Sequence, residues 1–368
     1  MKNILKNSTV LITGGSGSWG QELTKQLLEK FEVGEIKIYS RGEHKQVQMK
    51  RKFQDDRIKY FIGDVRNKDR LNSVLRKVDY VFHLAALKHV PVCEENPWEA
   101  VQTNIMGVQN LIEAAIENNV KKVIHVSTDK AVEPLNHYGT CKACGEKLIT
   151  AANLVDSTKF ACFRAGNVTG TNGSAIPLFR EQLLKLNMIT LTDPRMTRFL
   201  IRIEEAVAML IQVAEEFVGG EVFVMKTPAC KIIDLAGVMA DGLGRKKAKI
   251  KLIGIRPGEK LDEILVSKYE ISRTFEMDKY YVILPQIRLA ELEKEYRKKY
   301  RKKLLVKGRV KDINSANVPM LSKKELKKLL IDEGWLDSQF RDEFINYLDN
   351  LKSNDLENFR ESERWFKR

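Results

Sequence analysis

The feature that most constrains the fold is a glycine-rich turn close to the start of the chain. Residues 8–20 read Ser-Thr-Val-Leu-Ile-Thr-Gly-Gly-Ser-Gly-Ser-Trp-Gly, so an apolar strand runs into Gly14, Gly17 and Gly20. Leucines at helical spacing follow from about Gln21 and predict a helix. In this order, the glycines allow a tight turn and close approach to a pyrophosphate, which the helix N-terminus receives. The segment predicts a dinucleotide site rather than an ordinary turn.

The first half of the chain alternates strands with amphipathic helices, one of which is expected over residues 99–118. The strand candidates cover residues 8–12, 35–39, 58–62, 79–84, 121–126 and 159–163. Such alternation predicts an α/β fold built on a Rossmann-like, doubly wound parallel sheet.

Three regions are expected along the chain. Residues 1–165 should form the dinucleotide-binding domain, which also carries the catalytic residues. Residues 166–285, rich in glycine and asparagine at their start, should form a smaller α/β substrate lobe interleaved with the sheet. Residues 286–368 should form a charged, mostly helical C-terminal extension, in which Ser322 and Glu325 match a capping box and Gly334 a helix stop.

The end of the second predicted strand carries a further cofactor signal. An enzyme that uses NAD usually has an acidic residue there for the ribose 2′-hydroxyl. This chain has Ser40 and Arg41 instead, with Lys45 close behind. A hydroxyl and a guanidinium suit a 2′-phosphate, so the sequence favours NADP, although Arg41 could also be an ordinary loop cation.

The catalytic signal is Ser127-Thr-Asp-Lys130, which stands eight residues before Tyr138-Gly-Thr-Cys-Lys142. Tyr138 and Lys142 are four residues apart and share one face of a helix. A nearby ammonium and an oxidised nicotinamide favour the phenolate, which makes Tyr138 a usable base. Thr128 can hold a substrate hydroxyl. Asp129 and Lys130 add an acid–base pair that an enzyme expelling water needs, although such a pair could also be a surface ion pair.

Bulk properties narrow the function class further. The chain has 368 residues and a formal net charge of +14, but its basic residues are spread out and no nucleic-acid-binding signature accompanies them, so no nucleic-acid partner is expected. No apolar run reaches the ~18 residues that a membrane span requires, and no signal-peptide layout is visible, so we expect a cytoplasmic protein. Five scattered cysteines complete no zinc site, and no metal is expected.

Taken together in order, the motifs cover about residues 5–335 and resemble those of extended short-chain dehydrogenases/reductases. Within that group the chain is similar to the inverting UDP-N-acetylglucosamine 4,6-dehydratases of the pseudaminic acid type. Two details sharpen the resemblance, because glucose-type dehydratases carry Thr-Asp-Glu at 128–130 and the membrane-linked retaining relatives tend to have Met at 138. The motifs are Thr13-Gly-Gly-Ser-Gly-Ser-Trp-Gly20, Tyr39-Ser-Arg41, Gly63-Asp-Val-Arg66, Lys88-His-Val-Pro91, Ser127-Thr-Asp-Lys130, Tyr138-x-x-x-Lys142, Gly166-Asn-Val168, Met196-Thr-Arg-Phe199 and Arg256-Pro-Gly-Glu-Lys260.

The resemblance implies a set of roles. It implies catalysis by Thr128, Asp129, Lys130, Tyr138 and Lys142. It implies NADP contacts from Thr13, Gly14, Gly17, Ser18, Gly20, Ser40, Arg41, Lys45, Asp64, Val65, Ala85, Ala86, Lys88, Asn104, Tyr138 and Lys142. It implies contacts with UDP-N-acetylglucosamine from Lys88, Asn167, Arg198, Arg256 and Glu259. A homo-oligomer, either a dimer or a hexamer, is also expected.

Three alternatives stay open at the level of sequence. A retaining dehydratase would use the same residues and differ only in the face of C5 that is reprotonated. An NADP-dependent 4-epimerase would use Tyr138 and Lys142 but has no need of Asp129 and Lys130. A non-catalytic NADP-binding scaffold has no reason to keep a proton relay. The role of residues 336–368 is open as well.

Overall fold

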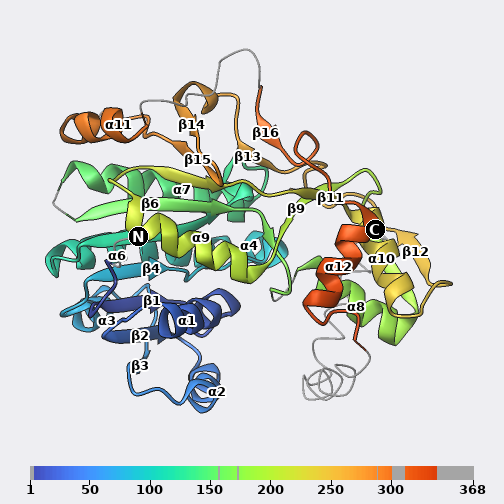
Figure 1. Ribbon diagram of the computed structural model, residues 1–368, viewed down its shortest axis with the longest axis horizontal. Helices are drawn as coiled ribbons and strands as arrows, with labels where there is room; N and C mark the ends of the chain where they lie inside the picture. Colours follow the sequence, from blue (N-terminus) through green and yellow to red (C-terminus); the bar gives the residue numbers. More distant parts are fainter. Residues whose placement is uncertain (1–3, 156–157, 172–173, 288, 301–310, 338–368) are drawn as a thin grey trace.

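The computed structural model describes residues 4–155, 158–171, 174–287, 289–300 and 311–337 (Figure 1). A large lobe is built on one nine-stranded sheet, and a small lobe lies beside it. The sheet runs in the order β14-β15-β10-β6-β5-β4-β1-β2-β3, with parallel pairing from β3 to β10 and antiparallel pairing at β15 and β14. Its strands are β1 (Thr9–Thr13), β2 (Glu35–Ser40), β3 (Ile58–Ile62), β4 (Tyr80–His83), β5 (Lys122–Thr128), β6 (Lys159–Ala165), β10 (Val222–Met225), β14 (Thr274–Glu276) and β15 (Tyr280–Ile283).

The predicted doubly wound parallel sheet is confirmed. Along β1, Val10 and Ile12 pack toward the helices of one face, whereas Leu11 packs toward those of the other, as alternation along a strand requires. One face carries α1 (Ser18–Lys30) and α9 (Ile203–Glu216). The other face carries α3 (Lys68–Leu75), α6 (Gly107–Glu117) and α7 (His137–Ala151). Both faces are therefore buried, which suits a parallel sheet. Further helices complete this lobe: α2 (Glu43–Phe53), α4 (Val90–Glu95), α5 (Pro97–Val101) and α11 (Glu293–Tyr300).

One expected element differs from the prediction. Instead of one continuous helix over 99–118, the chain forms α5, then a π-helical turn η1 (Gln102–Met106), then α6. The π turn holds Asn104, whose side chain reaches a neighbouring loop, and π turns often occur at functional sites.

The small lobe consists of short sheets covered by helices. Its strands are β7 (Asn167–Val168), β8 (Met188–Leu191), β9 (Thr197–Ile201), β11 (Ala229–Lys231) and β12 (Lys249–Leu252). The strands β13 (Ile264–Val266) and β16 (Ile313–Asn314) pair with each other and pack on the core of the large lobe. The helices of the small lobe are α8 (Ala175–Leu186), α10 (Ile232–Gly242) and α12 (Lys323–Asp332), which share one apolar core. Since β10, β14 and β15 return to the large sheet, the lobe is threaded through the chain rather than placed after the first domain.

The segment after residue 286 contributes to both lobes. Tyr296 and Tyr300 of α11 and Ile313 of β16 are buried in the cores of the large lobe, while α12 lies in the small one. The capping box predicted at Ser322 and Glu325 is present at the start of α12. Gly334 follows that helix with φ of 73°, as a helix stop requires. Residues 338–368 lie outside the described residues.

Candidate active site

The glycine turn is shaped as a dinucleotide cradle. Gly14 has φ of 67°, and a Cβ atom there would lie 2.8 Å from the backbone nitrogen of Ala85. Only glycine fits this approach of the β1 and β4 loops. Thr13 Oγ1 joins the same loops, since it lies 2.7 Å from His83 Nδ1 and accepts from the N–H groups of Leu84 and Ala85. Helix α1 begins just after Gly17 without an acidic residue in its first turn, which leaves its N-terminus suited to an anion.

Polar side chains meet at the ends of β2 and β3, where a ribose would lie in this fold. Ser16 donates a hydrogen bond to Ser40 at 2.9 Å. Arg41 is 56% exposed, and its guanidinium lies 3.9 Å from Asp64, which is also paired with Arg66 at 2.7 Å. The hydrogen bonds and charges of the arginines outweigh desolvation and lower the pKa of Asp64. Arg41 is thus held loosely and is free to pair with an added phosphate. Of the other predicted residues here, Val65 is buried and Lys45 is exposed on α2.

Asn104 fixes the loop that follows β4. Its side-chain amide donates to Leu87 O at 2.8 Å and accepts from Leu87 N at 2.9 Å. These two hydrogen bonds pair the backbone N–H and carbonyl groups of Leu87, as a neighbouring strand would in a sheet. They position the segment that carries Ala85, Ala86 and Lys88. The mid-helix asparagine therefore serves the site through the backbone.

Tyr138 and Lys142 lie on α7, whose N-cap residue Asn136 accepts a hydrogen bond from the N–H of Gly139. Both side chains are buried. Burial raises the pKa of Tyr138 to about 12, while the charge of Lys130 and a hydrogen bond with Thr128 act in the opposite direction. A phenolate at this position therefore depends on positive charge close to the ring.

Lys142 is held by groups that sequence reasoning missed. Its ammonium donates to Val126 O at 2.7 Å and lies 2.9 Å from His125 Nε2. Burial lowers the pKa of Lys142 to about 8. The rings of His125 and His83 stack with their centroids 5.1 Å apart. Burial is the main cause that lowers the pKa of His83 to about 3, and the positive charge of Lys142 adds to it. Both imidazoles are therefore neutral. The signal for them was a histidine that directly follows apolar residues in each of two buried strands, β4 and β5.

Thr128, Asp129 and Lys130 stand where β5 ends and a short 3-10 turn, η2 (Asp129–Ala131), begins. Thr128 donates to Asp129 Oδ1 at 2.9 Å, and Lys130 Nζ lies 3.1 Å from the same oxygen. A side chain at Gly139 would collide with the carbonyl oxygen of Lys130, so glycine lets α7 pack against this turn. The groups predicted for sugar oxidation and for elimination are thus joined in one network.

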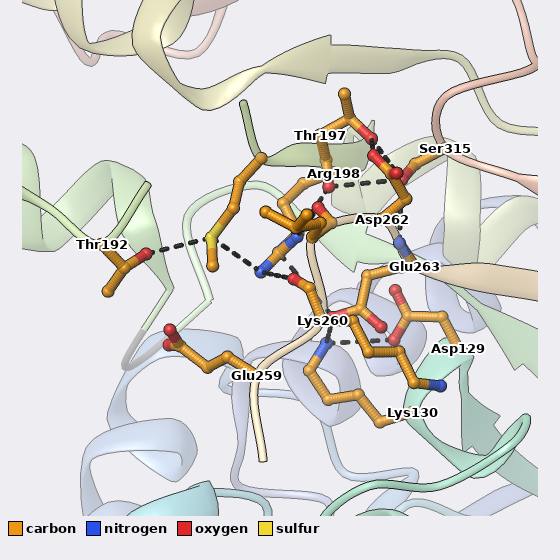
Figure 2. Close-up of polar contacts among 12 residues, drawn as sticks. Asp129, Lys130, Thr192, Thr197, Arg198, Glu259, Lys260, Asp262, Glu263 and Ser315 are labelled. Carbon is orange, nitrogen blue, oxygen red and sulfur yellow. Dashed lines mark hydrogen bonds and ion pairs between the residues drawn. The ribbon is translucent and has the colours of Figure 1, made fainter. Parts of the chain in front are cut away.

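Lys130 has a second carboxylate partner, Glu263, which stands just before β13. Figure 2 shows the Lys130 amine between the carboxylates of Asp129 and Glu263, at 3.1 and 3.2 Å. Burial alone would lower the pKa of Lys130, but these two carboxylates outweigh it and raise the pKa above its ordinary value. Nothing in the sequence pattern singled out Glu263, because its partner is distant along the chain.

The residues predicted to bind substrate divide into two groups. Arg198 is occupied, since its guanidinium donates to the carbonyl oxygens of Thr197, Leu261 and Lys260 and lies 3.7 Å from Glu263. Arg198 therefore holds the 260–263 segment in place.

The other predicted substrate contacts lie nearby with fewer side-chain contacts. Arg256 and Glu259 form a turn that docks through Gly258 O on Asn136, the N-cap of α7. In Figure 2, Glu259 points away from the carboxylates around Lys130. The buried Oδ1 of Asn167 has no hydrogen-bond partner within the described part of the chain. Burial lowers the pKa of Lys88, and the positive charge of the nearby Lys130 lowers it further.

A family model described as "Polysaccharide biosynthesis protein" matches residues 10–285. The chain is 45% identical over 297 residues to the UDP-N-acetylglucosamine 4,6-dehydratase (inverting) of Campylobacter jejuni subsp. jejuni (strain 81-176), covering 80% of this chain and 87% of that protein. It is 40% identical over 341 residues to a UDP-glucose 4-epimerase of Rickettsia bellii (strain OSU 85-389), covering 91% and 98%.

Solved structures agree with these matches. The X-ray structure of Pen from Bacillus thuringiensis has a TM-score of 0.82 and 37% identity, covering 91% of this chain and all of that one. The dTDP-glucose 4,6-dehydratase DesIV from Streptomyces venezuelae, solved with NAD, shares the fold with a TM-score of 0.65 and 24% identity, covering 69% of this chain and 86% of that one. Within the described residues, no helix has both the length and the apolar character to cross a membrane. The predicted resemblance is confirmed, and the chain belongs to the polysaccharide biosynthesis protein family, within the extended short-chain dehydrogenase/reductase fold.

Proposed function

We propose that this protein is an NADP-dependent hydro-lyase, a C5-inverting UDP-N-acetylglucosamine 4,6-dehydratase that forms a UDP-4-keto-6-deoxy sugar. The observation that carries the proposal is the connection of Tyr138, through Thr128 and Asp129, to Lys130. An enzyme that only oxidises or epimerises C4 uses the phenol and Lys142. An enzyme that also removes water needs an acid and a base beside them.

The first chemical task is removal of the proton from the 4-hydroxyl. Tyr138 is the base, Thr128 orients the hydroxyl, and Lys142 supplies positive charge on the same helix face. A nicotinamide dinucleotide, when bound against Gly14 and the β4 loop, supplies reversible redox chemistry that oxidises C4 and later reduces C6. Because burial raises the pKa of Tyr138 to about 12, these positive charges are what make the phenolate accessible near neutral pH.

The second task is elimination of water, and the Asp129–Lys130 contact suits it. With both groups ionised, the pair holds one mobile proton across a 3.1 Å contact. Transfer of that proton from the ammonium to the carboxylate creates a neutral amine and a carboxylic acid at once. The amine can take the C5 proton, which the 4-ketone acidifies, and the acid can protonate the departing 6-hydroxyl. Burial raises the pKa of Asp129, which favours its role as the acid.

Substrate recognition is assigned to cationic and amide groups around this network. Arg256 and Lys88 supply positive charge for a diphosphate, and Asn167 offers a buried amide oxygen that seeks a donor. Glu259 suits the hydroxyls of a ribose. Arg198 acts indirectly, because its guanidinium already holds the 260–263 segment.

Cofactor choice gives a first prediction. Arg41→Ala should weaken NADP binding about 10-fold and leave NAD binding nearly unchanged, because a guanidinium–phosphate contact is charge-assisted and only NADP has the 2′-phosphate. Titration of both cofactors by calorimetry measures the effect. Arg57→Ala, which changes an arginine beside the opposite end of β3, is the matched control. Equal affinity of the unchanged protein for the two cofactors would refute the preference.

Stereochemistry at C5 gives a second prediction. With UDP-N-acetylglucosamine in D₂O, the early product should be the L-arabino sugar with one deuterium at C5. A lysine base and a donor from the other face make opposite-face reprotonation possible. Coupling constants in the NMR spectrum distinguish L-arabino from D-xylo products. An early product that is only D-xylo would make the enzyme retaining and leave the assigned residues in place.

A 4-epimerase is the second candidate, because the Rickettsia bellii protein of that name matches more of the chain than the dehydratase does. The two activities differ in the product. A 4-epimerase returns a sugar that keeps its 6-hydroxyl, whereas the dehydratase product has a C6 methyl group and a ketone at C4. The same NMR experiment therefore decides between them, and an unchanged C6 would favour the epimerase.

A further inference from the structure

Glu263 is anchored by its backbone at the border of the small lobe. Its N–H donates to Ser315 Oγ at 2.9 Å, and its carbonyl oxygen accepts from Ser315 N at 2.8 Å. Ser315 Oγ lies in turn 2.6 Å from Thr197 Oγ1. The main chain of Glu263 is therefore fixed on both sides, and its side chain is directed at the large lobe (Figure 2).

The side chain of Glu263 is buried and makes two cationic contacts. Its Oε1 lies 3.2 Å from Lys130 Nζ and 3.7 Å from Arg198 Nε. Its Oε2 is buried and has no hydrogen-bond partner in the described part of the chain. Burying a carboxylate costs roughly several kcal/mol unless charges and hydrogen bonds compensate for the lost hydration. A buried carboxylate with one unpaired oxygen destabilises the fold if its role is only structural. Because its nearest cation is Lys130, a role in the chemistry fits Glu263 better.

The two carboxylates beside Lys130 differ in character. Burial raises the pKa of Asp129, whereas for Glu263 the charges of Lys130 and Arg198 outweigh burial and lower the pKa. Asp129 is therefore the carboxylate that can accept the proton of Lys130. Glu263 stays ionised and remains a fixed negative charge beside the amine. Two carboxylates whose pKa values are shifted in opposite directions by their surroundings usually perform different tasks.

We propose that Glu263 is a positioning residue which holds Lys130 as an ammonium ion in the resting site and thereby sets the pH range of the elimination step. This inference rests on the proposed dehydratase function. Glu263 opposes deprotonation of Lys130, whereas Arg198 on its other side weakens that opposition by drawing on the same carboxylate. The contact also orients the amine, since Lys130 receives two carboxylates from segments that are far apart along the chain.

The charged and titratable groups facing Lys130 all come from identified elements. They are Asp129 on η2, Tyr138 on α7, Lys88 in the β4 loop, Arg198 on β9, and Lys260 and Glu263 before β13. Among them, only Asp129 and Glu263 favour the charged amine. Removing the charge of Glu263 should therefore lower the pKa of Lys130, and removing the charge of Arg198 should raise it.

The test is a pair of variants with shifts of opposite sign. Glu263→Gln should lower the pKa of Lys130 by about one unit or more, and Arg198→Gln should raise it. The measurement is an NMR titration of the full-length protein with ¹³C-labelled lysine, in which the Lys130 signal is assigned by its loss in Lys130→Arg. Glu263→Asp, which keeps the charge, is the matched control and should restore most of the shift.

Kinetics supply the second readout. In Glu263→Gln, the fall of the elimination rate at high pH should move to lower pH by the same amount, because Lys130 then loses to solvent, at lower pH, the proton that it must pass to Asp129. The pH dependence of C4 oxidation, followed by transient NADPH absorbance, should not move. In Arg198→Gln, the fall of the elimination rate should move to higher pH. A purely structural contact would change rates without shifting these profiles in opposite directions.

Two results would overturn the proposal. One is a Lys130 pKa that stays within about 0.3 units of the unchanged protein in both variants, relative to the one-unit shift expected from a lost neighbouring charge. The other is an equal loss of oxidation and elimination with unchanged pH profiles. If Glu263→Gln fails to fold, Arg198→Gln alone still decides by the sign of its shift. If the protein dehydrates no UDP-sugar, the NMR shift still tests Glu263, while the dehydratase assignment fails separately.

Discussion

Tyr138→Phe is expected to slow C4 oxidation by about 1000-fold, within the range for loss of a positioned acid or base. The phenol is buried on the large-lobe helix α7 beside Thr128, and the other acid–base group in contact with Thr128, Asp129, is paired with Lys130. Without a base the 4-hydroxyl keeps its proton, and every later step is blocked. Single-turnover mixing with UDP-N-acetylglucosamine should then show no NADPH absorbance.

The control for this variant is Tyr60→Phe, which removes a hydroxyl that has no hydrogen-bond partner among the described residues. It should leave both steps intact. Cofactor binding by Tyr138→Phe should remain within about two-fold, because the change deletes one oxygen and no charge. Substantial C4 oxidation by Tyr138→Phe would mean that another group is the base and would remove Tyr138 from the mechanism.

Lys130→Ala is expected to separate the two half-reactions. Elimination should fall at least about 100-fold, the range for loss of a positioned acid or base, while some C4 oxidation survives. NADPH and a 4-keto sugar that still bears its 6-hydroxyl should therefore accumulate. The absorbance of NADPH and mass spectrometry of the quenched sugar measure the two products.

Two further variants sharpen this result. Lys130→Arg keeps the positive charge but cannot supply a neutral amine, so it should also fail to eliminate water. Lys185→Ala, on the exposed side of α8, is the matched lysine control and should behave as the unchanged protein. If Lys130→Ala keeps near-normal dehydration, Lys130 is not the base, and Asp129 must carry more of the chemistry.

The sequence predicted the large lobe well because its signals are local. Each predicted strand lies within about two residues of β1 to β6, since buried parallel strands read as short apolar runs between helices. The pairing of Tyr138 with Lys142 followed from one helical turn. The capping box at Ser322 was equally local.

The features that sequence reasoning missed depend on tertiary contacts. Glu263 is one acidic residue among several after Arg256, and only the packing of β13 against the end of β5 brings it to Lys130. The π turn around Asn104 was missed because its residues continue a helical pattern, while the reason to widen the turn lies in the loop at Leu87. Arg198 was assigned to substrate from a motif, and only the structure shows that its guanidinium also donates to carbonyl oxygens of the 260–263 segment.

The separation of Asp129 and Glu263 along the sequence has a consequence for protein engineering. The strand end at 128–130 is contiguous and easily transplanted, but Glu263 reaches it only because Ser315 and Thr197 fix its backbone. Changing three residues at the end of β5 in an epimerase of this fold would therefore install the pair without its counter-charge. A working transplant of water elimination calls for a two-segment graft, in which the 260–263 loop and its anchors travel with the strand end.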